Sequence, residues 1–308
     1  MNSEYNKKQN SYSLENKNSL GGFAFYCLMV VYVLLTFVGR AILSSFLTAD
    51  SVLFIAISSF FSIASIIFVF FVLNKRINGK LLENLSIKKC KFNYFVLAIF
   101  LSVAMFLGLG FVNDLFANIF KGWGLKVGSF NMPLTNAGEY ILFSICFAVL
   151  PSIAEEMFFR GFLLGLLDKS KPIVSSVVCS ICFAFYHCSL NQLIYQFIYG
   201  FFLCILAIKS KSIIPCIVAH FLNNFAIITF TFFNLKIDLY SVVLIVIGVI
   251  ILMFEVFCLF FVKNNKDKAE NQSGKEKNKN YKMFKSFLIP FGLIAILLCV
   301  AIIITNSI

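Results

Sequence analysis

A succession of long apolar stretches constrains this chain more than any other feature. Nine of them occur in 308 residues, each close to the roughly 20 residues that an α-helix needs to cross a bilayer. They lie at 22–46, 51–73, 93–117, 140–167, 172–190, 191–208, 213–233, 239–262 and 287–306. In lipid, every backbone polar group has to be bonded within the chain, so such segments are helical. The sequence therefore predicts an all-α fold, a polytopic integral membrane helix bundle of about eight to nine transmembrane helices.

The composition excludes a soluble enzyme. The chain is 60% hydrophobic and 13% charged, which is more apolar surface than one globular core can bury. The net charge of +12 follows from topology, because 21 of the 26 Lys and Arg residues fall in cytoplasmic segments if the N-terminus is cytoplasmic. We therefore expect a multi-pass protein of the cell membrane with a cytoplasmic N-terminus, in contact with membrane lipid and with no nucleic-acid partner.

Polar and basic stretches divide the chain into segments. The first residues are rich in Asn, Ser and Lys, and a basic, Asn-rich stretch separates the last apolar span from the others. We predict a disordered polar tail at 1–20, N-terminal transmembrane helices at 21–135, a core with the motifs described below at 136–235, a further transmembrane helix at 236–262, a basic linker at 263–286 and a C-terminal transmembrane helix at 287–308.

The fourth span carries three ionisable side chains where none is expected. An ionisable group at mid-membrane costs about 2.5–3.5 kcal/mol, so such residues are functional candidates. Glu156 and Arg160 are four residues apart with the acid first, which is the favoured spacing for a helical ion pair. Glu155 points about 100° away and is free to face another helix. Glu255 and Arg40 also lie in apolar spans, and the sequence assigns them no role.

Both histidines of the chain lie in apolar spans. His187 is in the fifth span, and His220 is in the seventh, with Asn224 one helical turn later on the same face. The helical rise places Glu155, His187 and Asn224 roughly 20, 22 and 16 Å from the cytoplasmic edge. The same count places His220 at roughly 10 Å. We therefore expect the first three residues to lie at one level, with His220 nearer the cytoplasm.

These residue types are suited to amide hydrolysis by activated water. A carboxylate in a low-dielectric pocket is a better proton acceptor near neutral pH, so Glu155 can take a proton from water. One neutral imidazole can orient that water, and a second imidazole with an amide N–H can stabilise the oxyanion of a tetrahedral intermediate. No Ser or Cys is clearly paired with a base, so the pattern does not indicate a covalent nucleophile.

Three short motifs in this region resemble those of a known family. They read Glu155-Glu156-Met-Phe-Phe-Arg160, Phe183-Ala-Phe-Tyr-His187 and His220-Phe-Leu-Asn-Asn224. In this order they resemble the motifs of the CAAX prenyl endopeptidase and bacteriocin-processing family of intramembrane proteases. The resemblance covers about residues 136–235. It implies a membrane endopeptidase that acts on peptides or membrane proteins, in peptide or bacteriocin maturation, self-immunity or CAAX-type processing.

The resemblance also implies a role for each motif residue. Glu155 corresponds to the general base and His187 to its helper, and His220 with Asn224 corresponds to the oxyanion-stabilising pair. Glu156 and Arg160 would hold the motif helix in shape.

The sequence leaves two questions open. Glu155, His187 and His220 with a water would also satisfy a catalytic zinc site, so a metalloprotease mechanism is an alternative. We favour a metal-free reaction with no cofactor, because Asn224 is a poor zinc ligand and a good oxyanion donor. The function also has alternatives. One is a non-catalytic membrane immunity or scaffold protein of the same fold, and another is a transporter that uses Glu155 and Glu156 as a proton relay.

Overall fold

The computed structural model describes residues 2–76, 85–127, 134–168, 170–235, 242–260 and 283–307. All regular structure in these ranges is helical. The elements are α1 (Asn2–Leu43), α2 (Val52–Arg76), α4 (Asn93–Val103), η1 (Ala104–Gly108), α5 (Phe111–Gly122), α6 (Ala137–Phe143), η2 (Ser144–Val149), α7 (Leu150–Glu156), η3 (Met157–Leu163), α8 (Leu164–Leu166), α9 (Pro172–Tyr186), α10 (Leu193–Ser210), α11 (Ile214–Phe232), α12 (Val242–Phe260), η5 (Leu288–Gly292) and α14 (Leu293–Ser307).

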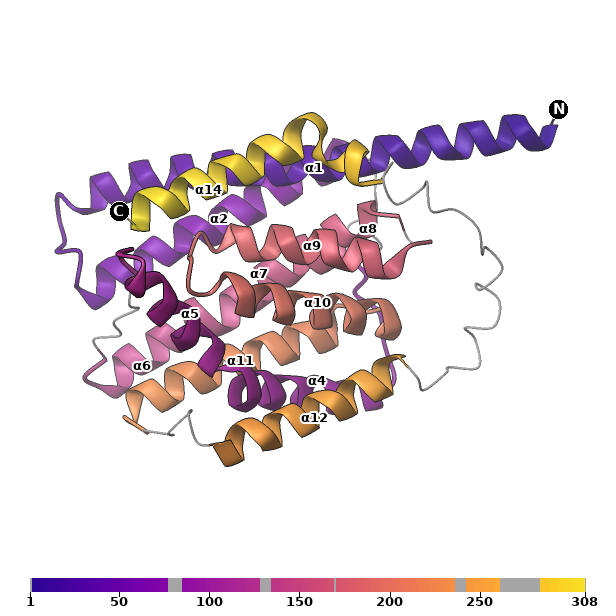
Figure 1. Ribbon diagram of the computed structural model, residues 1–308. Coiled ribbons are helices and arrows are strands. Elements are labelled where there is room, and N and C mark those ends of the chain that lie inside the picture. The colour runs from indigo at the N-terminus through magenta and orange to yellow at the C-terminus, as the bar shows by residue number, and fades with distance from the viewer. Residues whose placement is uncertain are drawn as a thin grey trace.

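The predicted fold class is confirmed. Within the described ranges, eight helical segments are long and apolar enough to cross a membrane, and α9 is a shorter apolar helix of 15 residues. Figure 1 shows their long axes running in broadly the same direction, with α1, α2 and α14 along one side of the bundle and α4 and α12 along the other. The helices α7, α9, α10 and α11 lie between these two sides. The chain is therefore a multi-pass membrane protein.

The fourth span is one continuous helical segment, Ala137–Leu166. It starts with a side-chain cap, because Asn136 Oδ1 accepts a hydrogen bond from the Glu139 N–H at 3.0 Å. Two π-helical stretches, η2 and η3, flank α7 on both sides. Such wide turns are rare and often occur at functional sites. The stretch η2 precedes α7 and rotates the side chains that follow it, so α7 presents Glu155 and Glu156 to its neighbours at an angle that a regular helix would not give.

The fifth span is shorter than its apolar stretch suggests. The sequence predicts 172–190, whereas α9 ends at Tyr186 and His187 is the residue that caps it. The turn from α9 to α10 lies inside the bundle, well short of the end that α2 and α6 reach (Figure 1). His187 is therefore placed inside the bundle by the end of a 15-residue helix, and not by a residue count along a full span.

The two ends of the chain differ in part from the predicted segments. Helix α1 begins at Asn2, so it includes most of the stretch 1–20 that the sequence analysis assigns to a polar tail. Residues 2–20 contain no proline or glycine that would end a helix propagating from the apolar part. Most of the predicted linker, 263–282, lies outside the described residues. Helix α14 packs against α1 and α9.

Candidate active site

The predicted ion pair is present and completely buried. Arg160 Nη1 lies 2.7 Å from Glu156 Oε1, and neither side chain is exposed. The guanidinium also donates from Nη2 to the Gly200 carbonyl at 3.3 Å and lies 4.1 Å from the centre of the Phe183 ring. A Cβ on Gly200 would come within 3.4 Å of Nη2 and 3.0 Å of the Phe183 ring, so glycine at this position of α10 leaves room for the guanidinium.

Glu156 has a second partner that the sequence did not predict. His220 Nδ1 lies 2.8 Å from the same carboxylate oxygen that Arg160 contacts. The carboxylate accepts, so His220 Nδ1 carries the proton. Glu156 therefore joins α7 to α11, and it leaves Nε2 as the His220 nitrogen that does not take part in this bond.

His187 is fixed in the same way by a different acceptor. Its Nδ1 lies 2.8 Å from the Phe183 carbonyl oxygen, one turn earlier on α9. A carbonyl oxygen can only accept, so His187 Nδ1 also carries the proton in the neutral ring. In both histidines, Nε2 is left with a lone pair.

Both Nε2 atoms face Glu155. Glu155 Oε2 lies 3.9 Å from His187 Nε2 and 3.8 Å from His220 Nε2. This oxygen is buried and makes no hydrogen bond within the described residues. Three hydrogen-bond acceptors thus surround one point, at separations too long for direct hydrogen bonds. Such an arrangement suits a water molecule, which can donate to two of the three acceptors, or a cation.

Asn224 lies farther from Glu155 than expected. Its side-chain Nδ2 donates to the Phe147 carbonyl in η2 at 3.0 Å. Phe147 precedes Glu155 by eight residues, or about 12 Å of helical rise. The depth estimate, which placed Asn224 level with Glu155 and His220 nearer the cytoplasm, is therefore wrong, since His220 is the residue beside Glu155. The estimate assumed that all helices start from one plane, and they do not.

Two tyrosines of α10 complete the surroundings and were missed in the sequence. Tyr195 donates its hydroxyl to Asn223 Oδ1 at 2.8 Å, and the Tyr199 ring lies edge-on to His220 with 6.0 Å between centroids. Tyr195 and Tyr199 are four residues apart in an apolar stretch. That spacing puts both on one helix face, and it is the sequence feature from which they could have been identified.

The donor set at Glu155 is chemically suited to zinc. Two histidine nitrogens and a carboxylate form a known catalytic zinc set, and each histidine is held through its other nitrogen, as metal-bound histidines are. The separations of 3.8 and 3.9 Å exceed the roughly 3.3 Å expected between ligands of a tetrahedral zinc ion. Among the described residues, no group of three His, Cys, Asp or Glu side chains is close enough to hold a metal. Glu155, His187 and His220 would hold one only after moving closer together.

The comparison with family models identifies the same region. Residues 137–226 match the model described as Rce1-like, type II CAAX prenyl endopeptidase Rce1-like. The predicted family resemblance is confirmed over this segment. It begins at the first residue of α6, ends two residues after Asn224 and contains all six predicted site residues. Searches of curated proteins and of solved structures found no match. Over this segment of the described bundle, the chain is therefore similar to type II CAAX prenyl endopeptidases.

Proposed function

We propose that the protein is an intramembrane endopeptidase that hydrolyses a peptide bond with a water molecule activated by Glu155. The observation that carries the proposal is the convergence of Glu155 Oε2 with the two free Nε2 atoms of His187 and His220, at 3.9 and 3.8 Å. A water molecule about 2.8 Å from both Glu155 Oε2 and one of these Nε2 atoms would bridge the two groups. The water would donate its hydrogens to two of these acceptors and direct an oxygen lone pair outward.

Glu155 would then act first as base and later as acid. As the water oxygen bonds to the scissile carbonyl carbon, Glu155 Oε2 takes one proton from the water. The carbonyl π electrons move to oxygen, which becomes an oxyanion. When the oxyanion collapses, the C–N bond breaks, and Glu155 returns the proton to the departing nitrogen. His187 Nε2 keeps the water oriented during the first step.

Glu156 and Arg160 would prepare His220 for oxyanion stabilisation. With Nδ1 bonded to Glu156, His220 can donate to the oxyanion from Nε2 only when that nitrogen also carries a proton. Arg160 holds the carboxylate in place. Asn224 uses Nδ2 toward Phe147, and its amide has a second N–H that can donate to a substrate oxygen.

A zinc-dependent reaction is the second candidate, because the same convergence favours a cation. Zinc held by Glu155, His187 and His220 would act as a Lewis acid on the scissile carbonyl. Glu155 would then be a ligand and could not serve as the base. The two candidates therefore differ in what they predict for Glu155 and for chelation. The substrates we propose are peptides or membrane proteins, including bacteriocin or peptide precursors and CAAX-type substrates.

The test is peptidomics of new N-termini in membranes that contain wild-type protein or Glu155→Gln. We expect Glu155→Gln and His187→Ala to lose the cleavage products while their membrane abundance is unchanged. Asp114→Asn is the matched control, because Asp114 is an exposed acid on α5 and its replacement should leave cleavage intact.

Two outcomes would change the proposal. Cleavage that survives in Glu155→Gln would overturn the mechanism in which Glu155 activates the water. Cleavage that a chelator abolishes and zinc restores would select the metal-dependent candidate.

A further inference from the structure

A cavity of about 430 Å³ lies between α4, α12 and the end of α10. Ligand pockets in proteins typically measure about 300–1,000 Å³, so this one is large enough for part of a lipid. None of the residues that line it belongs to the candidate active site. The lining residues are Phe92, Asn93, Tyr94, Val96, Leu97, Phe100, Lys209, Phe254, Cys258 and Leu259.

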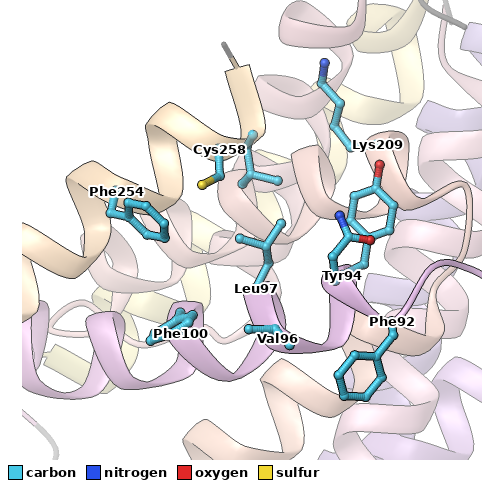
Figure 2. A pocket seen from close by; sticks show the side chains of 10 residues that line it. Phe92, Tyr94, Val96, Leu97, Phe100, Lys209, Phe254 and Cys258 are labelled. Carbon is cyan, nitrogen blue, oxygen red and sulfur yellow. The ribbon is translucent and has the colours of Figure 1, made fainter. Parts of the chain in front are cut away.

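The walls of the cavity are apolar and face outward from the bundle. Figure 2 shows Phe254 and Cys258 on α12 opposite Leu97 and Phe100 on α4. Phe254 and Phe100 are 53% and 39% exposed, as expected for side chains in contact with acyl chains. Farther along, α12 and η1 are in backbone contact, because a Cβ on Gly248 would overlap the backbone of Gly108. This crossing closes the space between the two helices at that end.

The other end of the cavity is basic. Lys209, in the last turn of α10, lies above Tyr94 at this end of the cavity (Figure 2). Lys88, Lys89 and Lys91 precede α4 and are exposed. An occupant of this cavity therefore meets apolar side chains along its length and positive charge at one end.

We propose that the cavity binds an anionic glycerophospholipid. One acyl chain would lie between α4 and α12, and the phosphate would lie at Lys209. This occupant matches both the apolar walls and the charge, because basic pockets between membrane helices on the cytoplasmic side bind anionic head groups. A zwitterionic lipid would fit the walls but would gain less from Lys209. The bound lipid would fill the space between α12 and α4, and α4 itself packs against α11.

The test uses the purified full-length protein in mixed micelles. Thermal unfolding is followed while phosphatidylglycerol or phosphatidylcholine with the same acyl chains is added. We expect phosphatidylglycerol to raise the unfolding temperature in a saturable way and phosphatidylcholine to raise it less. A single basic residue near an anionic lipid surface corresponds to about a fivefold change in affinity, so Lys209→Gln should weaken phosphatidylglycerol binding about fivefold.

Two further variants separate this site from general charge and fold effects. Lys121→Gln removes an exposed lysine of α5 and should bind as the wild type does. Val96→Trp fills the cavity and should lose the lipid effect while unfolding cooperatively without lipid. Equal effects of the two lipids would overturn the proposal, as would unchanged binding in Lys209→Gln or a full effect of inorganic phosphate alone.

Discussion

Removing one partner of the buried ion pair should cost far more stability than removing both. Glu156 and Arg160 are 2.7 Å apart with no side-chain exposure, so Arg160→Met leaves a buried carboxylate and Glu156→Gln leaves a buried guanidinium. Each single change is expected to cost about 3–5 kcal/mol of unfolding free energy. The double variant buries no unpaired charge, and the amide oxygen introduced by Glu156→Gln could still accept from His220. Its cost should be about 1–2 kcal/mol, so the coupling energy is at least about 4 kcal/mol.

The measurement is equilibrium unfolding of the four proteins in mixed micelles at one lipid composition, followed by circular dichroism. The double-mutant cycle isolates the pair from the effect of each side chain on its other neighbours. The reasoning would be refuted if each single variant lost less than about 1 kcal/mol of unfolding free energy and the double variant lost the sum of the two. Such values are typical of a solvated surface pair.

Three further predictions concern packing, hydrogen bonding and topology. Gly200→Ala places a methyl against the buried guanidinium and ring and should cost about 1–3 kcal/mol, measured by thermal unfolding. Tyr195→Phe leaves the buried oxygen of Asn223 without its donor and should cost about 1–2 kcal/mol, whereas a loss near zero would show that water replaces the hydroxyl. Cysteines introduced at Lys88 and Lys121 should react with an impermeant maleimide from opposite sides of the membrane, and labelling from the same side would refute the predicted topology.

The sequence was sufficient for the features that depend on local spacing. Apolar length predicted the spans, and the four-residue spacing predicted the pair between Glu156 and Arg160. The scarcity of histidine drew attention to His187 and His220, which both lie next to Glu155. These inferences need only the helical repeat and the cost of charge in lipid.

Features that depend on how helices are placed against one another could not be predicted. The hydrogen bond between His220 and Glu156 joins residues 64 positions apart, and its register depends on where each helix starts. The end of α9 at Tyr186 was missed although His187, Ser189 and Asn191 interrupt the apolar stretch directly after it, because the next apolar residues follow at once. The π-helical turns around α7 also have no sequence signature that would fix the direction of Glu155 in advance.

The carboxylate of Glu155 should make the protein less stable to unfolding than an uncharged amide at the same position would. Glu155 Oε2, His187 Nε2 and His220 Nε2 are all acceptors, and the carboxylate oxygen is buried without a hydrogen bond within the described residues. In Glu155→Gln, the amide N–H₂ can donate to both imidazoles after a shift of about 1 Å. We therefore expect this variant to be inactive and about 1–2 kcal/mol more stable to unfolding. If the site binds zinc, Glu155→Gln should instead lower the stability to unfolding in zinc-containing buffer, because the variant would lose a zinc ligand. A lower unfolding temperature both with zinc and with chelator would refute the view that the three acceptors oppose one another.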